Sequence, residues 1–114
     1  MIFPDRANHY GTLFGGHALN LLSKAAFLAA SRHARCDVVM GRCQNVDFLR
    51  PVKVGQALRL AARVIRVGQS SMTVQVDGMA ETLASGDVFS AMTGTFEMVA
   101  VDAQGRPQTI GLPI

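Results

Sequence analysis

In the first third of the chain, the apolar residues recur with the period of a helix. Between residues 17 and 30, ten of fourteen side chains are apolar, and the four polar ones fall within a stripe about 120° wide on a helical wheel. Alanine and leucine dominate and no proline interrupts them, so the pattern predicts one long, mostly apolar helix. Gly15 and Gly16 precede this helix, and Arg32 and His33 lie near its end, where the helix dipole favours cations.

The remainder of the chain has the period of strands. Met72, Val74 and Val76 alternate with polar neighbours, and the phase changes at Gly78, which predicts a half-buried strand with a bulge. Short polar segments at residues 68–70 and 85–87 predict two hairpin turns. The complete pattern predicts antiparallel strands at residues 38–49, 57–67, 71–77 and 88–101, with Ile2 and Phe3 as the remnant of a fifth.

A helix that is apolar nearly all round needs a curled sheet, because a flat sheet covers only one of its faces. We therefore predict an α+β fold in which a curled antiparallel sheet is wrapped around one long central helix. The 114 residues make a single domain, residues 1–114. Since 49% of them are apolar and only 17% are charged, disorder is excluded, and we expect part of the apolar surface to meet another subunit.

Charge and cysteine content narrow the function classes further. The net charge of +3 includes no basic run longer than two residues, which argues against a nucleic-acid partner. Cys36 and Cys43 are too few for a disulfide framework or a zinc site, so we expect no metal and a reducing, cytoplasmic location. Residues 1–5 lack the features of a secretory signal, and the interrupted apolar run at residues 18–30 is shorter than the roughly 20 residues of a membrane span. We expect no membrane partner.

Three motifs, in order along the chain, resemble those of the hotdog-fold acyl-CoA thioesterases. Residues 8–16 have the pattern Asn-x-x-Gly-x-x-Phe-Gly-Gly, residues 48–55 read Phe-Leu-Arg-Pro-Val-Lys-Val-Gly, and residues 67–71 read Val-Gly-Gln-Ser-Ser. The resemblance implies a hotdog fold and a homodimer at least, with tetramers and hexamers as alternatives. It implies an active site at the dimer interface, with the pantetheine arm between subunits, and hydrolysis of a fatty or short-chain acyl-CoA to CoA and free acid. No cofactor is expected, because CoA is part of the substrate.

The resemblance also implies roles for individual residues. Asn8 would orient water or the carbonyl, while Gly15 and Gly16 would polarise the thioester carbonyl through their amides, since a helix N-terminus stripped of side chains can meet a developing negative charge. Ser23 occupies the remaining catalytic position. The residues expected to bind the substrate are Phe14, His17, Phe48, Arg50, Arg66, Ser70 and Ser71.

Ser23 is the main departure from the family pattern. The position seven residues after the second glycine usually carries an aspartate in the similar enzymes, and a serine hydroxyl is a poor general base. Thr12 also stands where some relatives have an aspartate. Ser23 could position a water, and His17 or His9 could act as the base instead. The alternative is a hotdog protein that binds acyl-CoA with weak or no catalysis; a hydratase is a weaker alternative, because no histidine and aspartate are placed together at a strand end.

Overall fold

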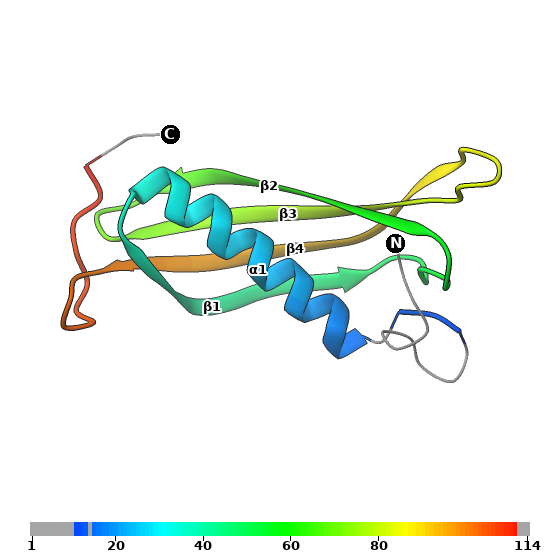
Figure 1. Ribbon diagram of the computed structural model, residues 1–114. Coiled ribbons are helices and arrows are strands. Elements are labelled where there is room, and N and C mark those ends of the chain that lie inside the picture. Colours follow the sequence, from blue (N-terminus) through cyan, green and yellow to red (C-terminus); the bar gives the residue numbers. More distant parts are fainter. Residues whose placement is uncertain (1–10, 14, 112–114) are drawn as a thin grey trace.

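The computed structural model, which describes residues 11–13 and 15–111, has one helix on a four-stranded sheet (Figure 1). Every neighbouring pair of strands is antiparallel, and the strand order is β1-β4-β3-β2. Helix α1 lies along one face of this curled sheet, which confirms the predicted α+β architecture. The elements are α1 (Gly15–Ala34), β1 (Asp37–Phe48), β2 (Ala57–Val67), β3 (Ser71–Glu81) and β4 (Val88–Val101).

The period-2 pattern located the strands closely. The bounds of β2 and β4 are those predicted, and β1 is displaced by one residue. The predicted bulge is present, since the register between β3 and β4 shifts between Gly78 and Met79. Both hairpin turns are confirmed, and Gly86 has the positive φ of 79° that such turns favour in glycine. The prediction that Ile2 and Phe3 belong to a fifth strand lies outside the described residues.

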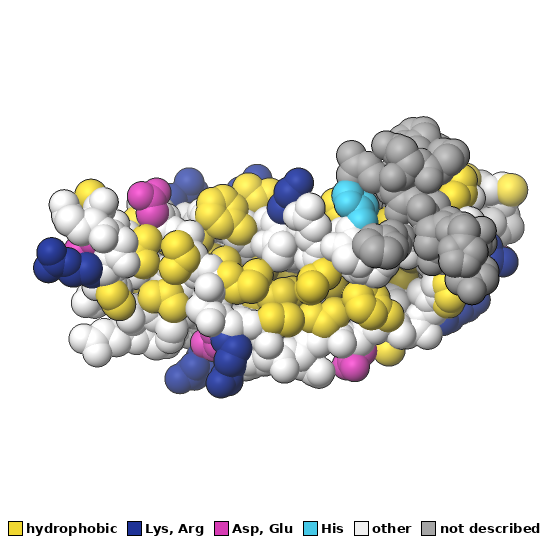
Figure 2. All heavy atoms as spheres, turned by 90° about the horizontal axis from the view of Figure 1, so that it is seen from below, with side chains coloured by type: hydrophobic (Ala, Val, Ile, Leu, Met, Phe, Trp, Pro, Cys, Tyr) yellow, Lys and Arg dark blue, Asp and Glu magenta, His cyan; other side chains and the backbone are white. Residues whose placement is uncertain are grey.

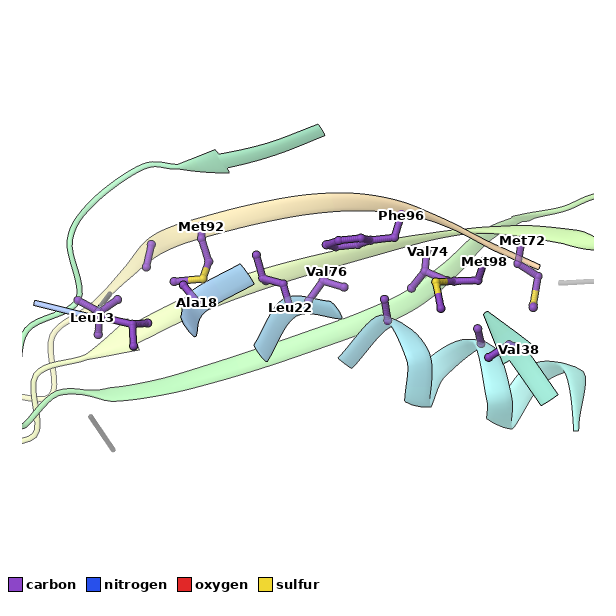
Figure 3. Packing of buried hydrophobic residues seen from close by; sticks show 14 of the residues in the cluster. Leu13, Ala18, Leu22, Val38, Met72, Val74, Val76, Met92, Phe96 and Met98 are labelled. Carbon is purple, nitrogen blue, oxygen red and sulfur yellow. The ribbon is translucent and has the colours of Figure 1, made fainter. Parts of the chain in front are cut away.

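The core lies between one face of α1 and the two central strands. The buried helix residues recur at every fourth position, and three of the four are alanines, which let the helix approach the sheet closely. The inward side chains of β3 and β4 complete the cluster (Figure 3). The largest fully buried side chains are Phe96, Leu22, Met72, Met98, Val74 and Val76.

Large apolar side chains stay uncovered along strand β1, which is one edge of the sheet. Val39, Met40 and Phe48 are 49%, 42% and 55% exposed. Figure 2 views the molecule from below, which is the side on which β1 lies in Figure 1. Hydrophobic side chains gather along the face seen there. A long edge strand with exposed apolar side chains favours pairing with another chain. On the helix itself, Leu19, Phe27 and Leu28 are exposed as well, so one copy covers α1 incompletely.

Candidate functional site

The first turn of α1 begins with two glycines, whose backbone amides have no side chain of their own to cover them. Gly15 and Gly16 are both exposed, and no acidic residue lies in this turn. The N–H groups of a first turn have no partner within their helix, and they sit at the positive end of its dipole. A Cβ added to Gly15 would meet no described atom within 4 Å, and its helical backbone suits any residue. Among the described residues, packing does not require a glycine at position 15, so this position is open to an approaching group.

A cavity of about 230 Å³ lies beside this turn. The backbone N–H of Leu13 donates to the carbonyl of Val52 at 2.7 Å, which ties the helix entry to the segment after β1. The N–H groups of Leu49 and Arg50 donate to the carbonyl of Ala91 at 2.8 and 3.2 Å. Residues of the first two motifs thus come together here, and the predicted contact of Phe48 and Arg50 with substrate stays a prediction. The lining is mainly apolar and consists of Leu13, Gly15, Ala18, Phe48, Leu49, Arg50, Pro51, Val52 and Met92.

Arg50 stands between this cavity and a second, more polar groove of about 510 Å³. Its guanidinium carbon lies 4.0 Å from the ring centroid of Phe89, which fixes an otherwise exposed cation. Lys53 borders the same groove. Two cations beside an apolar cavity suit a ligand that has phosphates at one end and an apolar group at the other.

Ser23 lies two turns further along α1, about 10 Å from Gly16 along the helix axis. The residue is half-buried, and its hydroxyl donates an exposed hydrogen bond to the carbonyl of Asn20 at 2.8 Å. Leu19, Ser23 and Phe27 form an i, i+4, i+8 row. Leu28 lies on the other flank of the helix, in a groove against β2. The serine therefore faces the flank nearer the open edge at β1, and the helix has no aspartate or glutamate to accompany it.

His17 is half-buried in the first turn of α1, at the same end of the molecule as the cavity. Two histidines, His17 and His9, are expected as alternative bases, and the structure describes only His17. Asn8, His9 and Phe14 lie outside the described residues, so their predicted roles stay predictions.

The third motif lies at the opposite end of the sheet. Ser71 pairs with Val99, whereas Gly78 pairs with Met92 beside the cavity, and seven residues of strand span roughly 23 Å. Hydrogen bonds hold the turn in place; in one of them the N–H of Ala100 donates to the carbonyl of Ser70 at 2.8 Å. Within one copy the structure does not bring Arg66, Ser70 and Ser71 to the cavity, because motif order along a chain does not fix distance in space. Their predicted contact with substrate stays a prediction.

Sequence reasoning did not single out Leu13, Val52, Met92 or Phe89 for this site. Met92 belongs to the buried core, and it also lines the cavity. The signal for this second role is the pairing of Met92 with Phe48 across β4 and β1. That register becomes visible only when both strands are placed, because the two residues are far apart in the sequence.

Comparison with known proteins identifies the family. Residues 10–86 match the family model described as Thioesterase superfamily. The chain is 38% identical over 104 residues to an uncharacterised acyl-CoA thioester hydrolase of Zymomonas mobilis, covering 91% of this chain and 70% of that protein. It is 36% identical over 106 residues to a similarly described protein of Bacillus subtilis, covering 93% of this chain and 62% of that one. The acyl-CoA thioester hydrolase YciA of Escherichia coli is 29% identical over 113 residues, covering 96% of this chain and 86% of that protein.

Solved structures show the same likeness. A hexameric acyl-CoA thioesterase in its apo form superposes with a TM-score of 0.95 at 35% identity, covering 96% of this chain and 70% of that one. An acyl-CoA hydrolase of Staphylococcus aureus, solved with butyryl-CoA and CoA, superposes with a TM-score of 0.92 at 33% identity. The match covers 96% of this chain and 67% of that one. The chain thus spans about two thirds of the length of several proteins that it matches. Among the described residues, no helix is both long and apolar enough to cross a membrane.

Proposed function

Because this chain belongs to the thioesterase superfamily, we propose that it hydrolyses acyl-CoA thioesters to CoA and a carboxylic acid at a site completed where two copies meet. The observation that carries the proposal is the uncovered first turn of α1 beside an apolar cavity. The turn offers N–H donors to a carbonyl oxygen, and the cavity offers room for an apolar group attached to that carbonyl.

In this mechanism the thioester carbonyl lies against the amides of Gly15 and Gly16. Water adds to the carbonyl carbon, and negative charge develops on the oxygen that the amides face. The carbon–sulfur bond then breaks, the sulfur leaves as the thiol of CoA with one proton from the water, and the oxygen of that water stays in the carboxylic acid. Asn8 orients the reactants, and Ser23 or a histidine, His17 or His9, holds the water. We propose that the reaction needs no metal and no organic cofactor.

The assembly we propose is a homodimer joined along β1, with tetramers and hexamers built from it. The exposed apolar side chains of β1 support this choice. Antiparallel pairing of two β1 strands reverses the second copy, so its far end, which carries the motif with Ser70 and Ser71, approaches the cavity end of the first. The pantetheine arm of the substrate would run between the two copies. We also propose a cytoplasmic location, which the free thiols of Cys36 and Cys43 support.

The direct test is release of free thiol from a series of acyl-CoAs, from acetyl to palmitoyl, measured with a thiol reagent. We expect turnover above the uncatalysed rate for at least one chain length. Absence of turnover at every length overturns hydrolysis as the function. Sedimentation of the same sample tests the shared site, because a chain that is strictly monomeric at all concentrations cannot supply it.

Ser23 favours a second candidate function, binding of acyl-CoA without efficient hydrolysis. Its hydroxyl already donates to the carbonyl of Asn20, and the helix has no carboxylate to activate water. General acid–base help is worth about 10²- to 10⁴-fold in rate, so its loss would leave binding largely intact while slowing chemistry. Calorimetric titration with CoA separates the two candidates, because tight binding without thiol release supports the second.

A further inference from the structure

A row of paired residues crosses the sheet at the inner end of the cavity. Met92 of β4 pairs with Phe48 of β1 on one side and with Gly78 of β3 on the other. Gly78 in turn pairs with Leu60 of β2. Figure 3 places Met92 with Leu13 and Ala18 at one end of the buried cluster, and all three residues line the cavity.

The side chain of Met92 occupies the space above Gly78. A Cβ on Gly78 would lie 2.5 Å from Cγ and 3.3 Å from Sδ of Met92, and 3.2 Å from Cδ2 of Leu60. A side chain at position 78 would therefore collide with the methionine. Glycine gives this flexible, unbranched side chain room to lie across β3, and Met92 lines the cavity together with Leu13 and Ala18.

We propose that Met92 sets the length of acyl chain that the cavity accepts, with Gly78 as the residue that gives it room. The inference rests on the proposed function, and it adds the residue that limits the length of the acyl group. A carbonyl held at Gly15 has its two substituents on opposite sides. The cavity beside Gly15 is mainly apolar and ends at buried residues, which suits an acyl chain, whereas the amide groups of pantetheine need hydrogen-bond partners.

Chain length is therefore the measured variable. Non-hydrolysable thioether analogues of acyl-CoA, from butyryl to palmitoyl length, are titrated by calorimetry, and the matching thioesters are assayed for thiol release. In the unaltered chain, affinity should rise about fourfold with each buried methylene until the acyl end reaches Met92, and should then stop rising. Met92→Ala removes three side-chain atoms and should move that limit by about two carbons toward longer chains.

Met98→Ala is the matched control, because Met98 is an equally buried methionine on the same strand and does not line the cavity. It should lose comparable stability and leave the length limit where it was. Gly78→Ala is a second, opposite variant: the added Cβ pushes Met92 toward the cavity, so the limit should move to shorter chains.

The outcomes separate this proposal from the function on which it rests. An unchanged limit in a folded Met92→Ala, or a longer limit in Gly78→Ala, overturns the proposal. A limit that moves as expected without any thiol release supports it and removes hydrolysis as the function. Thiol release that does not depend on chain length supports hydrolysis as the function and overturns the role of Met92. Absence of binding at every length overturns both the role of Met92 and the proposed function.

Discussion

Two paired rows cross the same sheet, and each has a buried methionine on β4, but the paired residue on β3 is of very different size in the two rows. Beside the cavity, Met92 of β4 faces Gly78 of β3; toward the other end of the sheet, Met98 of β4 faces Met72 of β3. Both β4 methionines are buried, at 2% and 1% exposure, and six residues or roughly 20 Å of strand separate them. Burial alone does not distinguish Met92, which lines a cavity, from Met98, which fills the core. The paired residue on β3 differs between them: it is Gly78 for Met92 and Met72 for Met98.

The two ends of α1 differ in a related way. The first turn has exposed glycines, no acidic side chain and a cavity beside it. The last turn carries Arg32 and His33, and Arg35 then turns the chain with a left-handed φ of 55° while its N–H donates to the carbonyl of Ser31. We propose the first end as the one that binds a ligand, whereas the contacts of the second end stabilise the fold. Substitutions at the first end should therefore change turnover, and those at the second should change stability.

The largest effect is expected from Ser23→Asp, which supplies a carboxylate on the flank of α1 nearer the open edge. If the missing base limits the rate, kcat should rise by about 10²- to 10⁴-fold, because that is the usual worth of general acid–base catalysis. Steady-state thiol release measures it. Ser23→Asn has nearly the same shape without the charge and should give no such gain; equal rates in the two variants would contradict the assignment.

Gly15→Pro tests the amides directly and ranks second. Proline fits the first position of a helix but has no N–H, so the variant deletes one donor while keeping the helix start. We expect kcat to fall by about 10²- to 10³-fold, as for removal of one oxyanion donor. Gly15→Ala retains the N–H and serves as the control; its Cβ should raise KM with a much smaller change in kcat. A Gly15→Pro enzyme as fast as Gly15→Ala would remove this amide from the mechanism.

Val38→Ala probes the far end of the core, where Val38 is buried and pairs with Ala100. Loss of two buried methyl-sized groups should lower the free energy of unfolding by about 2 kcal/mol. Urea denaturation at fixed protein concentration measures this change, and kcat should stay within a factor of about two, since the expected loss lies in stability. A large fall in kcat at unchanged stability would mean that the two ends are not separate in function.

The smallest effect is expected at Asp102, in the turn that follows β4. Its Oδ1 accepts hydrogen bonds from the N–H groups of Gln104 and Arg106 at 2.9 and 3.0 Å. Asp102→Ala removes both bonds, but the freed N–H groups lie in exposed residues, so the cost should be about 1 kcal/mol. Asp102→Asn keeps an acceptor oxygen and should lose less. Thermal unfolding compares the two variants, and equal losses would exclude the hydrogen bonds as the cause.

The sequence predicted the elements well because each has its own local period. The bounds of β2 and β4, the bulge at Gly78 and the helix of mainly alanine and leucine needed no long-range information. The register shifts of β1, between Met40 and Arg42 and between Cys43 and Asn45, were not predicted. They arise from how β1 meets β4, and Gly41 illustrates why: a Cβ there would lie 3.1 Å from Cγ2 of Val99.

The candidate site was predictable only in part for the same reason. The motifs indicated Gly15, Phe48 and Arg50, and the structure brings them to one cavity. They also suggested Ser71, which lies at the other end of β3. A motif shows which residue types follow one another along the chain. The residues that line the cavity depend on how strands from distant parts of the chain are aligned. Met92 could not be recognised as part of that wall until β1, β3 and β4 were aligned.

The close approach at Gly78 also has an evolutionary consequence. Positions 78 and 92 share one volume, so a larger residue at 78 must displace the side chain at 92 or be matched by a smaller one there. We expect the two positions to change together among related chains. A lineage that acquires alanine at 78 and a short side chain at 92 would keep its fold and redistribute the same space between two strands.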